Sequence, residues 1–266
     1  MRFIPLPDDY GAHLLGRRGD DWRGDPSALI DAFRRERALL APDVWIVGGL
    51  AGGLAAAAAA AGPDARAILA TPAWTALRTA VRHLADAGAV PALPGATLLA
   101  TGLYGLAEMS GADTEDAIDD ASLLLAGLVR ALIEDGAKAV AIVESPGAVD
   151  PALLAAFRTP VLRVVEHHRA AAWLVFDGTA PFAAVAGGAV AGTLFPSADV
   201  RARPATAEVG LGLDPAVLAR PLTPAAGAEI AAAAAGAAAF APLVPAGALP
   251  EAVLALAGAV GARRAA

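Results

Sequence analysis

The strongest constraint on the fold is a pair of short apolar segments, each of which ends in a carboxylic acid. Residues 138–143, KAVAIV, run into Glu144, and residues 172–176, AWLVF, run into Asp177. A strand that is apolar on both faces is typical of a buried parallel sheet. In α/β barrels the residues just beyond the carboxyl ends of such strands line the active site. Because a bare buried charge costs several kcal/mol, we expect both acids in a solvated pocket or paired.

Strand-like apolar runs alternate with longer helical stretches along the whole chain, which is typical of βα units. At 266 residues the chain has the length of one α/β barrel. We therefore predict a single (β/α)8 barrel over residues 1–266, with residues 7–26 as a loop over its mouth. The predicted strands are 3–6, 44–47, 96–101, 139–143, 173–176, 191–195, 208–211 and 237–241, with 66–69 as a competing strand.

Helix boundaries are marked by proline, serine and threonine at the amino ends and by glycine at one carboxyl end. The uncharged stretch at 44–62 is nearly long enough to span a membrane. Its glycine pairs favour a strand, a turn and an Ala-rich helix instead. The other predicted helices are 28–40, 73–87, which carries His83 on its surface, 114–135, 151–168, 223–235 and 250–260.

Composition excludes several classes of function. The net charge is −7 and no basic stripe is present, which argues against a nucleic-acid surface. The chain has no cysteine, so disulfides, thiolate catalysis and cysteine zinc sites are excluded. The first residues contain no apolar core long enough for a signal peptide, which predicts a cytoplasmic protein. We expect no membrane partner and no cofactor.

Five segments, in order, resemble motifs of the uroporphyrinogen decarboxylase and cobalamin-independent methionine synthase superfamily. Residues 90–101 resemble a segment with glycine and proline that begins a strand in this superfamily. Residues 119–145 resemble its long helix followed by a strand that ends in Glu-Ser. Residues 153–165 are similar to a helix with an internal proline. Residues 173–178 lie where some members carry a His-x-Cys-Gly zinc element, and 210–224 are similar to its Leu-Asp-Pro element. The resemblance implies a TIM barrel and either decarboxylation or methyl transfer.

The chain departs from the decarboxylase pattern at several positions. The second strand ends in Gly48-Gly49 without the family's aspartate, and the late Gly-His-Gly element is missing. Asp177 stands where the zinc-dependent members have cysteine. The resemblance therefore implies a divergent member, with Ser145 at a substrate-pocket position and with chemistry that does not use zinc.

Glu144 and Asp177 are the predicted catalytic residues, since two carboxylates on neighbouring strand ends can share or transfer a proton. Their alternatives are a salt bridge for Glu144 and a turn for Asp177. Ser145 either binds substrate or caps a turn. No metal ligands are predicted. The other predicted substrate-binding residues are Tyr104, Arg17, Arg18, Ser197 and Asp199.

The sequence favours a lyase of the decarboxylase type that acts on a small polar or anionic molecule by carboxylate acid/base chemistry. The first alternative is a zinc-independent, or corrinoid- or folate-linked, methyltransferase. The second is a non-catalytic member that binds a ligand or a partner chain. The Ala-rich helices offer small, flat surfaces for close packing in a homodimer.

Overall fold

A computed structural model describes residues 1–17, 21–47, 50–61, 65–104, 112–144, 151–176, 189–201 and 209–265. Within these residues eight strands form one sheet in the order β1-β9-β8-β7-β6-β5-β4-β3, and β2 pairs separately with β10. Every pair is parallel. The strands are β1 (Arg2–Phe3), β2 (Leu6–Asp8), β3 (Trp45–Val47), β4 (Ala89–Pro94), β5 (Ala139–Glu144), β6 (Ala171–Phe176), β7 (Val190–Asp199), β8 (Val209–Gly212), β9 (Ala239–Phe240) and β10 (Leu243–Pro245).

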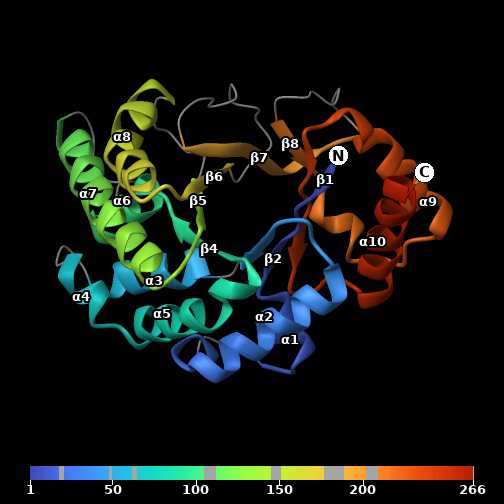
Figure 1. Ribbon diagram of the computed structural model, residues 1–266, viewed down its shortest axis with the longest axis horizontal. Helices are drawn as coiled ribbons and strands as arrows, with labels where there is room; N and C mark the ends of the chain where they lie inside the picture. Colours follow the sequence, from blue (N-terminus) through green and yellow to red (C-terminus); the bar gives the residue numbers. More distant parts are fainter. Residues whose placement is uncertain are drawn as a thin grey trace.

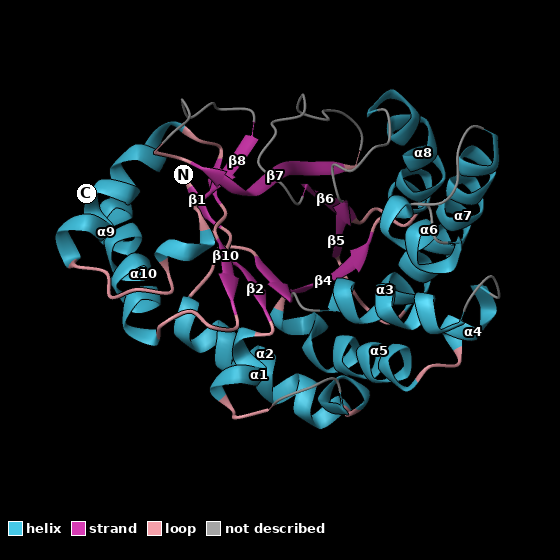
Figure 2. Cartoon of the chain, turned by 180° about the vertical axis from the view of Figure 1, so that it is seen from behind, coloured by secondary structure: helices cyan, strands magenta, loops and turns pink. Residues whose placement is uncertain are grey.

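The sheet curls so that its two ends approach each other. The N–H of Asp43, two residues before β3, donates to the Phe3 carbonyl of β1 at 2.8 Å. The Phe3 N–H in turn donates to Oδ2 of Asp43 at 2.6 Å. The strands curve around a common centre and the helices lie outside them (Figure 1, Figure 2). This arrangement confirms the prediction of an α/β fold of the TIM-barrel type.

Alternate strand residues point to opposite sides of the sheet, as the strand period requires. One set packs under the helices and includes Phe3, Phe240, Phe176 and Phe195. The other set fills the centre of the barrel, which is therefore a packed core. Its buried members are Ile4, Leu6, Ile46, Val90, Ala92, Ala141, Trp173, Val175, Leu194, Ala239 and Ala241.

Helices follow most strands and begin at residues that satisfy their free N–H groups. The Thr71 hydroxyl accepts from Trp74 N at 3.2 Å, and the Thr223 hydroxyl accepts from Ala226 N at the same distance. The helices are α1 (Tyr10–Leu14), α2 (Pro26–Leu40), α3 (Leu50–Ala61), α4 (Ala65–Leu69), α5 (Pro72–Leu84), α6 (Ala96–Tyr104), α7 (Ala112–Glu134), α8 (Pro151–His167), α9 (Pro224–Ala233) and α10 (Pro250–Ala265), with 3₁₀ turns η1 (Asp21–Gly24), η2 (Ala85–Ala87), η4 (Pro215–Val217) and η5 (Ala234–Gly236).

The predicted Ala-rich helix after the second strand is confirmed as α3, and the six other predicted helices are confirmed as α2, α5, α7, α8, α9 and α10. None of the helices in the described ranges combines the length and the apolar character that a membrane crossing requires. The segment at 44–62 thus contributes β3 and α3, as its glycine pairs indicated.

Three strand predictions are wrong in part or in full. Residues 96–101 form helix α6, and the third strand is β4, which ends at Pro94. Residues 66–69 belong to helix α4. The predicted strand 3–6 is interrupted between β1 and β2, although the N–H groups of Ile4 and Leu6 still donate to Phe240 and Pro242.

The segment between β2 and α2 packs on α2 through an unusually close contact. A Cβ on Gly11 would lie 2.3 Å from the Ala32 carbonyl oxygen, so only glycine fits there. The Gly11 N–H donates to Oε1 of Glu36 at 2.7 Å. Helix α1 thus lies against α2 (Figure 1). The arrangement of residues 7–26 over the barrel mouth stays a prediction.

The Glu36 side chain, 3 % exposed, is a buried acid in this contact. Burial raises its pKa from 4.5 to about 8, with further increases from Asp9 and Asp8 and a decrease from the Gly11 hydrogen bond. A raised pKa in the folded state means that the folded protein binds this proton more tightly than the unfolded chain does. The free energy of unfolding therefore falls as the pH rises from about 4.5 to about 8.

Replacing Glu36 by Gln removes this titration but keeps an oxygen that can accept from Gly11. We expect Glu36→Gln to gain stability relative to the native protein as the pH rises from 5.5 to 8.5, by up to about 1.4 kcal/mol per pH unit. Urea unfolding followed by circular dichroism measures this difference. Glu229→Gln, on the exposed surface of α9, should keep the native pH dependence. The same pH dependence in Glu36→Gln as in the native protein would contradict the assignment.

Candidate active site at the carboxyl ends of the strands

Glu144 is the last residue of β5 and its side chain is buried, with 1 % exposed. Its two carboxylate oxygens accept from the first N–H groups of α6: Oε1 from Ala96 at 3.1 Å and Oε2 from Thr97 at 3.3 Å. The first N–H groups of a helix have no partner within the helix, and its amino end favours negative charge. Through these hydrogen bonds Glu144 connects the end of β5 to the start of α6.

Gly95 makes this contact possible. It connects β4 to α6, and its N–H donates to the Val143 carbonyl at 2.7 Å. A Cβ at this position would lie 2.0 Å from the carboxylate carbon of Glu144. The glycine is therefore required by the close approach of the carboxylate to the backbone.

The end of β6 lies beside Glu144. In the parallel pairing of β5 with β6, Glu144 is opposite Phe176, the residue that precedes Asp177. Asp177, Ser145 and Arg18 themselves lie outside the described residues. The pairing of Glu144 with Asp177 at one site, and the contact of Ser145 and Arg18 with substrate, therefore stay predictions.

A second charged group lies beyond β7 and β8. Arg201 donates to both oxygens of Asp199, from Nε at 3.0 Å and from Nη2 at 2.5 Å. This hydrogen bonding is the largest cause that holds the pKa of Asp199 below its ordinary value, and Asp199 raises the pKa of Arg201. Asp214 follows β8, and its carboxylate accepts from Ala216 N at 2.9 Å. Asp199 is thus an ionised, paired carboxylate at the barrel end.

Arg201 and Asp214 are not among the predicted site residues, although Asp214 belongs to the Leu-Asp-Pro element at 210–224. Arg201 lies two residues beyond Asp199, a spacing that allows a local ion pair, and Asp214 precedes Pro215 in the position of a helix cap. The two-residue spacing of Asp199 and Arg201 and the Asp-Pro pair are both visible in the sequence, but such patterns are common in turns. Ser197 lies in β7 and is half-buried.

Tyr104 and Arg17 both form hydrogen bonds within the chain. Tyr104 is the last residue of α6, and its hydroxyl donates to Oδ2 of Asp120 on α7 at 3.3 Å. Tyr104 follows the segment 96–101, which was predicted as a strand and is helical. Arg17 has an exposed side chain, and its N–H donates to the Ala12 carbonyl at 2.9 Å. Substrate contacts by either residue stay predictions.

The chain does not fit the zinc element found in some members of the superfamily. That element needs thiolates, and the sequence contains no cysteine. Across the described ranges, no cluster of three or more histidine and acidic side chains has the arrangement of a metal site. The chain therefore cannot hold zinc through the thiolates of that element.

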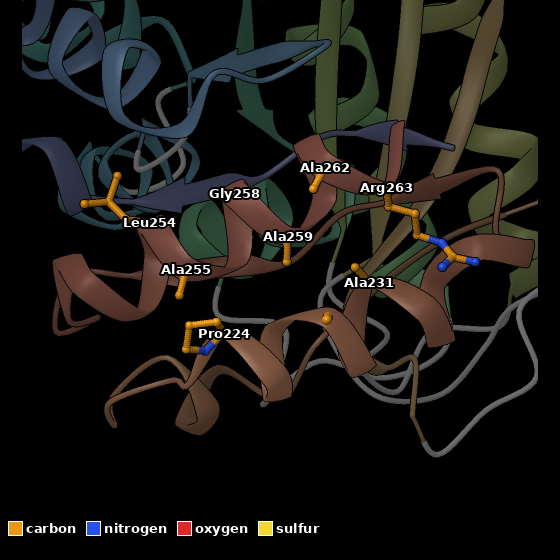
Figure 3. A pocket seen from close by; sticks show the side chains of 9 residues that line it. Pro224, Ala231, Leu254, Ala255, Gly258, Ala259, Ala262 and Arg263 are labelled. Carbon is orange, nitrogen blue, oxygen red and sulfur yellow. The ribbon is translucent and has the colours of Figure 1, made fainter. Parts of the chain in front are cut away.

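A separate groove of about 550 Å³ lies between α9 and α10, on the outside of the barrel. Figure 3 shows that small side chains line most of it, with Leu254 at one end and Arg263 at the other. Arg263 is its only charged lining residue. A groove of this kind lacks the converging polar groups of a catalytic site.

Comparisons with known proteins give information on the fold. No protein-family model matches the chain, and no curated protein sequence matches it. A search of solved structures finds, among others, a methyltransferase from Methanosarcina mazei with a TM-score of 0.71 and 12 % sequence identity. The match covers 99 % of this chain and 95 % of that protein. At this identity the likeness establishes the fold.

The prediction of a decarboxylase-type lyase is contradicted by this finding. The similar structure is a methyltransferase, and the match runs over almost the whole of both chains. The motifs that suggested the lyase are shared across the superfamily. The motifs therefore do not distinguish decarboxylation from methyl transfer.

The contact between Gly95 and Glu144 can be tested by a pair of matched substitutions. Gly95→Ala forces a methyl group into the Glu144 carboxylate, and we expect it to destabilise the protein by about 2–4 kcal/mol. Gly127→Ala adds the same methyl group inside α7, where nothing lies within 4 Å. We expect it to be stabilising by up to about 1 kcal/mol, because alanine is the better helix former. Chemical denaturation measures both, and equal effects of the two changes would contradict the described packing.

Proposed function

We propose that this protein is a methyltransferase of the uroporphyrinogen decarboxylase and methionine synthase superfamily. Its site would lie at the carboxyl ends of the barrel strands. The observation that carries the proposal is the likeness in fold, along nearly the full length of both chains, to a methyltransferase. The order of the five motifs in the sequence supports the superfamily part of the proposal and does not distinguish its reactions. The proposed substrates are a methyl donor and a small polar acceptor.

Methyl transfer to an oxygen, nitrogen or sulfur acceptor leaves a proton that must be removed. A carboxylate near the acceptor can take this proton as a general base. We assign this task to Asp177, which follows the strand residue opposite Glu144. With Asp177 as the base, activation of the acceptor needs neither thiolate nor zinc, in agreement with a chain that has no cysteine.

Glu144 has a different proposed task. Both of its oxygens already accept N–H groups of α6, and the side chain is buried. A carboxylate held in this way positions the ends of β5 and α6 and supplies negative potential at the site. This potential suits a donor or an intermediate with positive charge, since opposite charges attract strongly where water is excluded.

The proposal is tested by methyl-transfer assays with methyltetrahydrofolate and methylcobalamin as alternative donors. Small thiols and amines serve as acceptors, and mass spectrometry detects the methylated product. We expect turnover with one of the donors by the native protein. Asp177→Asn should lower kcat by about 10²–10⁴-fold, the usual contribution of a general base. Its thermal unfolding should be close to that of the native protein.

Glu134→Gln is the matched control, because Glu134 lies on the surface of α7 and pairs only with Arg130 among the described residues. We expect it to retain native activity. Glu144→Gln should lose both stability and activity, since its amide would direct an N–H group toward the N–H groups of α6. Binding of a donor without turnover would contradict the proposal in favour of a non-catalytic binding protein. Full activity of Asp177→Asn would contradict the assigned base.

A further inference from the structure

A second pocket lies at the opposite end of the barrel from the candidate active site. It has a volume of about 460 Å³, within the usual range for sites that bind small molecules. It is formed where α2 and α5 lie side by side (Figure 1, Figure 2), at the amino ends of β3 and β4. Its lining residues are Arg34, Arg37, Ala38, Ala41, Pro42, Trp45, His83, Leu84 and Ala87.

The charged and titratable side chains that line this pocket are all basic and can donate hydrogen bonds to an anion. Arg34 and Arg37 contribute guanidinium groups and His83 an imidazole, and no acidic side chain lines the pocket. In the part of the chain that the structure describes, neither guanidinium forms an ion pair. Both arginines are exposed, so their guanidinium groups are accessible to a ligand from solvent.

Trp45 contributes an aromatic wall to this pocket. The Arg37 guanidinium carbon lies 4.9 Å from the centre of its ring, which holds this arginine over the indole. The Trp45 side chain is 5 % exposed, and its indole N–H has no acceptor among the described residues. This donor is buried, so what Trp45 contributes to the pocket is its aromatic ring.

We propose that this pocket binds a small oxyanion that carries an apolar group, either a phosphate monoester or a carboxylate. The planar guanidinium groups of Arg34 and Arg37 match the oxygens of such an anion and can bind them in pairs. His83 lies on α5, across the pocket from α2, and supplies a further donor. The side chains of Ala38, Ala41, Pro42, Leu84 and Ala87 provide the apolar walls.

This site is independent of the proposed function. In a parallel barrel the amino ends of the strands lie on the face away from the chemistry. Trp45 begins β3, and Ala87 lies two residues before β4. A ligand in this pocket is therefore neither the methyl donor nor the acceptor, and it binds whether or not the protein transfers methyl groups.

Isothermal titration calorimetry of the full chain with phenyl phosphate and with benzoate tests the proposal. We expect saturable binding of one molecule of at least one of the two anions. Benzyl alcohol, which has the ring without the charge, should show no saturable binding. The double substitution Arg34→Gln and Arg37→Gln should weaken binding roughly tenfold or more, since each charge-assisted hydrogen bond contributes a factor of this order.

Arg35→Gln provides the matched control, because Arg35 is exposed on the same helix but does not line the pocket. It removes one positive charge from α2 and should leave the affinity within about twofold of native, as an exposed charge outside the site contributes little. Preference for phenyl phosphate or for benzoate identifies the class of oxyanion. Absence of binding for both anions, or an equal loss of affinity in Arg35→Gln, would overturn the proposal.

Discussion

The hydrogen bonds between the Glu144 carboxylate and the first turn of α6 determine how the carboxyl end of this barrel is built. They join β5 to the helix that follows β4, and Gly95 allows the contact by leaving no side chain in the way. These hydrogen bonds are favourable because a buried carboxylate and the unpaired N–H groups of a helix each need a partner. The position of the strand end, the start of α6 and the placement of the buried charge all depend on this one contact.

The small side chains of this alanine-rich chain have a structural role at the centre of the barrel. Most of its buried residues are small or branched, and Trp173 on β6 is the largest. Gly192 pairs with Trp173 on the neighbouring strand β7, and a Cβ there would lie 2.7 Å from the indole ring. The glycine therefore makes room for the indole ring at this level of the barrel.

The sequence predicts the parts of the fold that local patterns determine. β5 is recognised because its apolar residues are bounded by Gly136 and Glu144, and α5 and α9 because a threonine and a proline begin them. α6 is mistaken for a strand because its apolar and threonine-rich residues favour either structure. The true third strand, β4, contains Pro91 and Pro94, which usually argue against a strand. Pro94 fits because the N–H that bonds to Val143 belongs to Gly95.

The candidate site is predictable only in part. That Glu144 would need partners follows from its place at the end of an apolar strand. That the partners are the N–H groups of Ala96 and Thr97 depends on a contact between residues 47 or 48 positions apart, which no local pattern shows. The ion pair of Asp199 and Arg201 is local in the sequence, but its spacing is also that of an ordinary turn. The reaction was wrongly predicted because the motifs mark barrel positions shared by lyases and methyltransferases.

We propose that small molecules react at the carboxyl ends of the strands, beside Glu144. A crystal structure of the protein grown with methyltetrahydrofolate or methylcobalamin tests this placement. We expect density for the donor beyond the ends of β5 and β6, with its methyl group near Glu144 and Asp177. Density for the donor only at the amino ends of the strands, or only in the groove between α9 and α10, would contradict it.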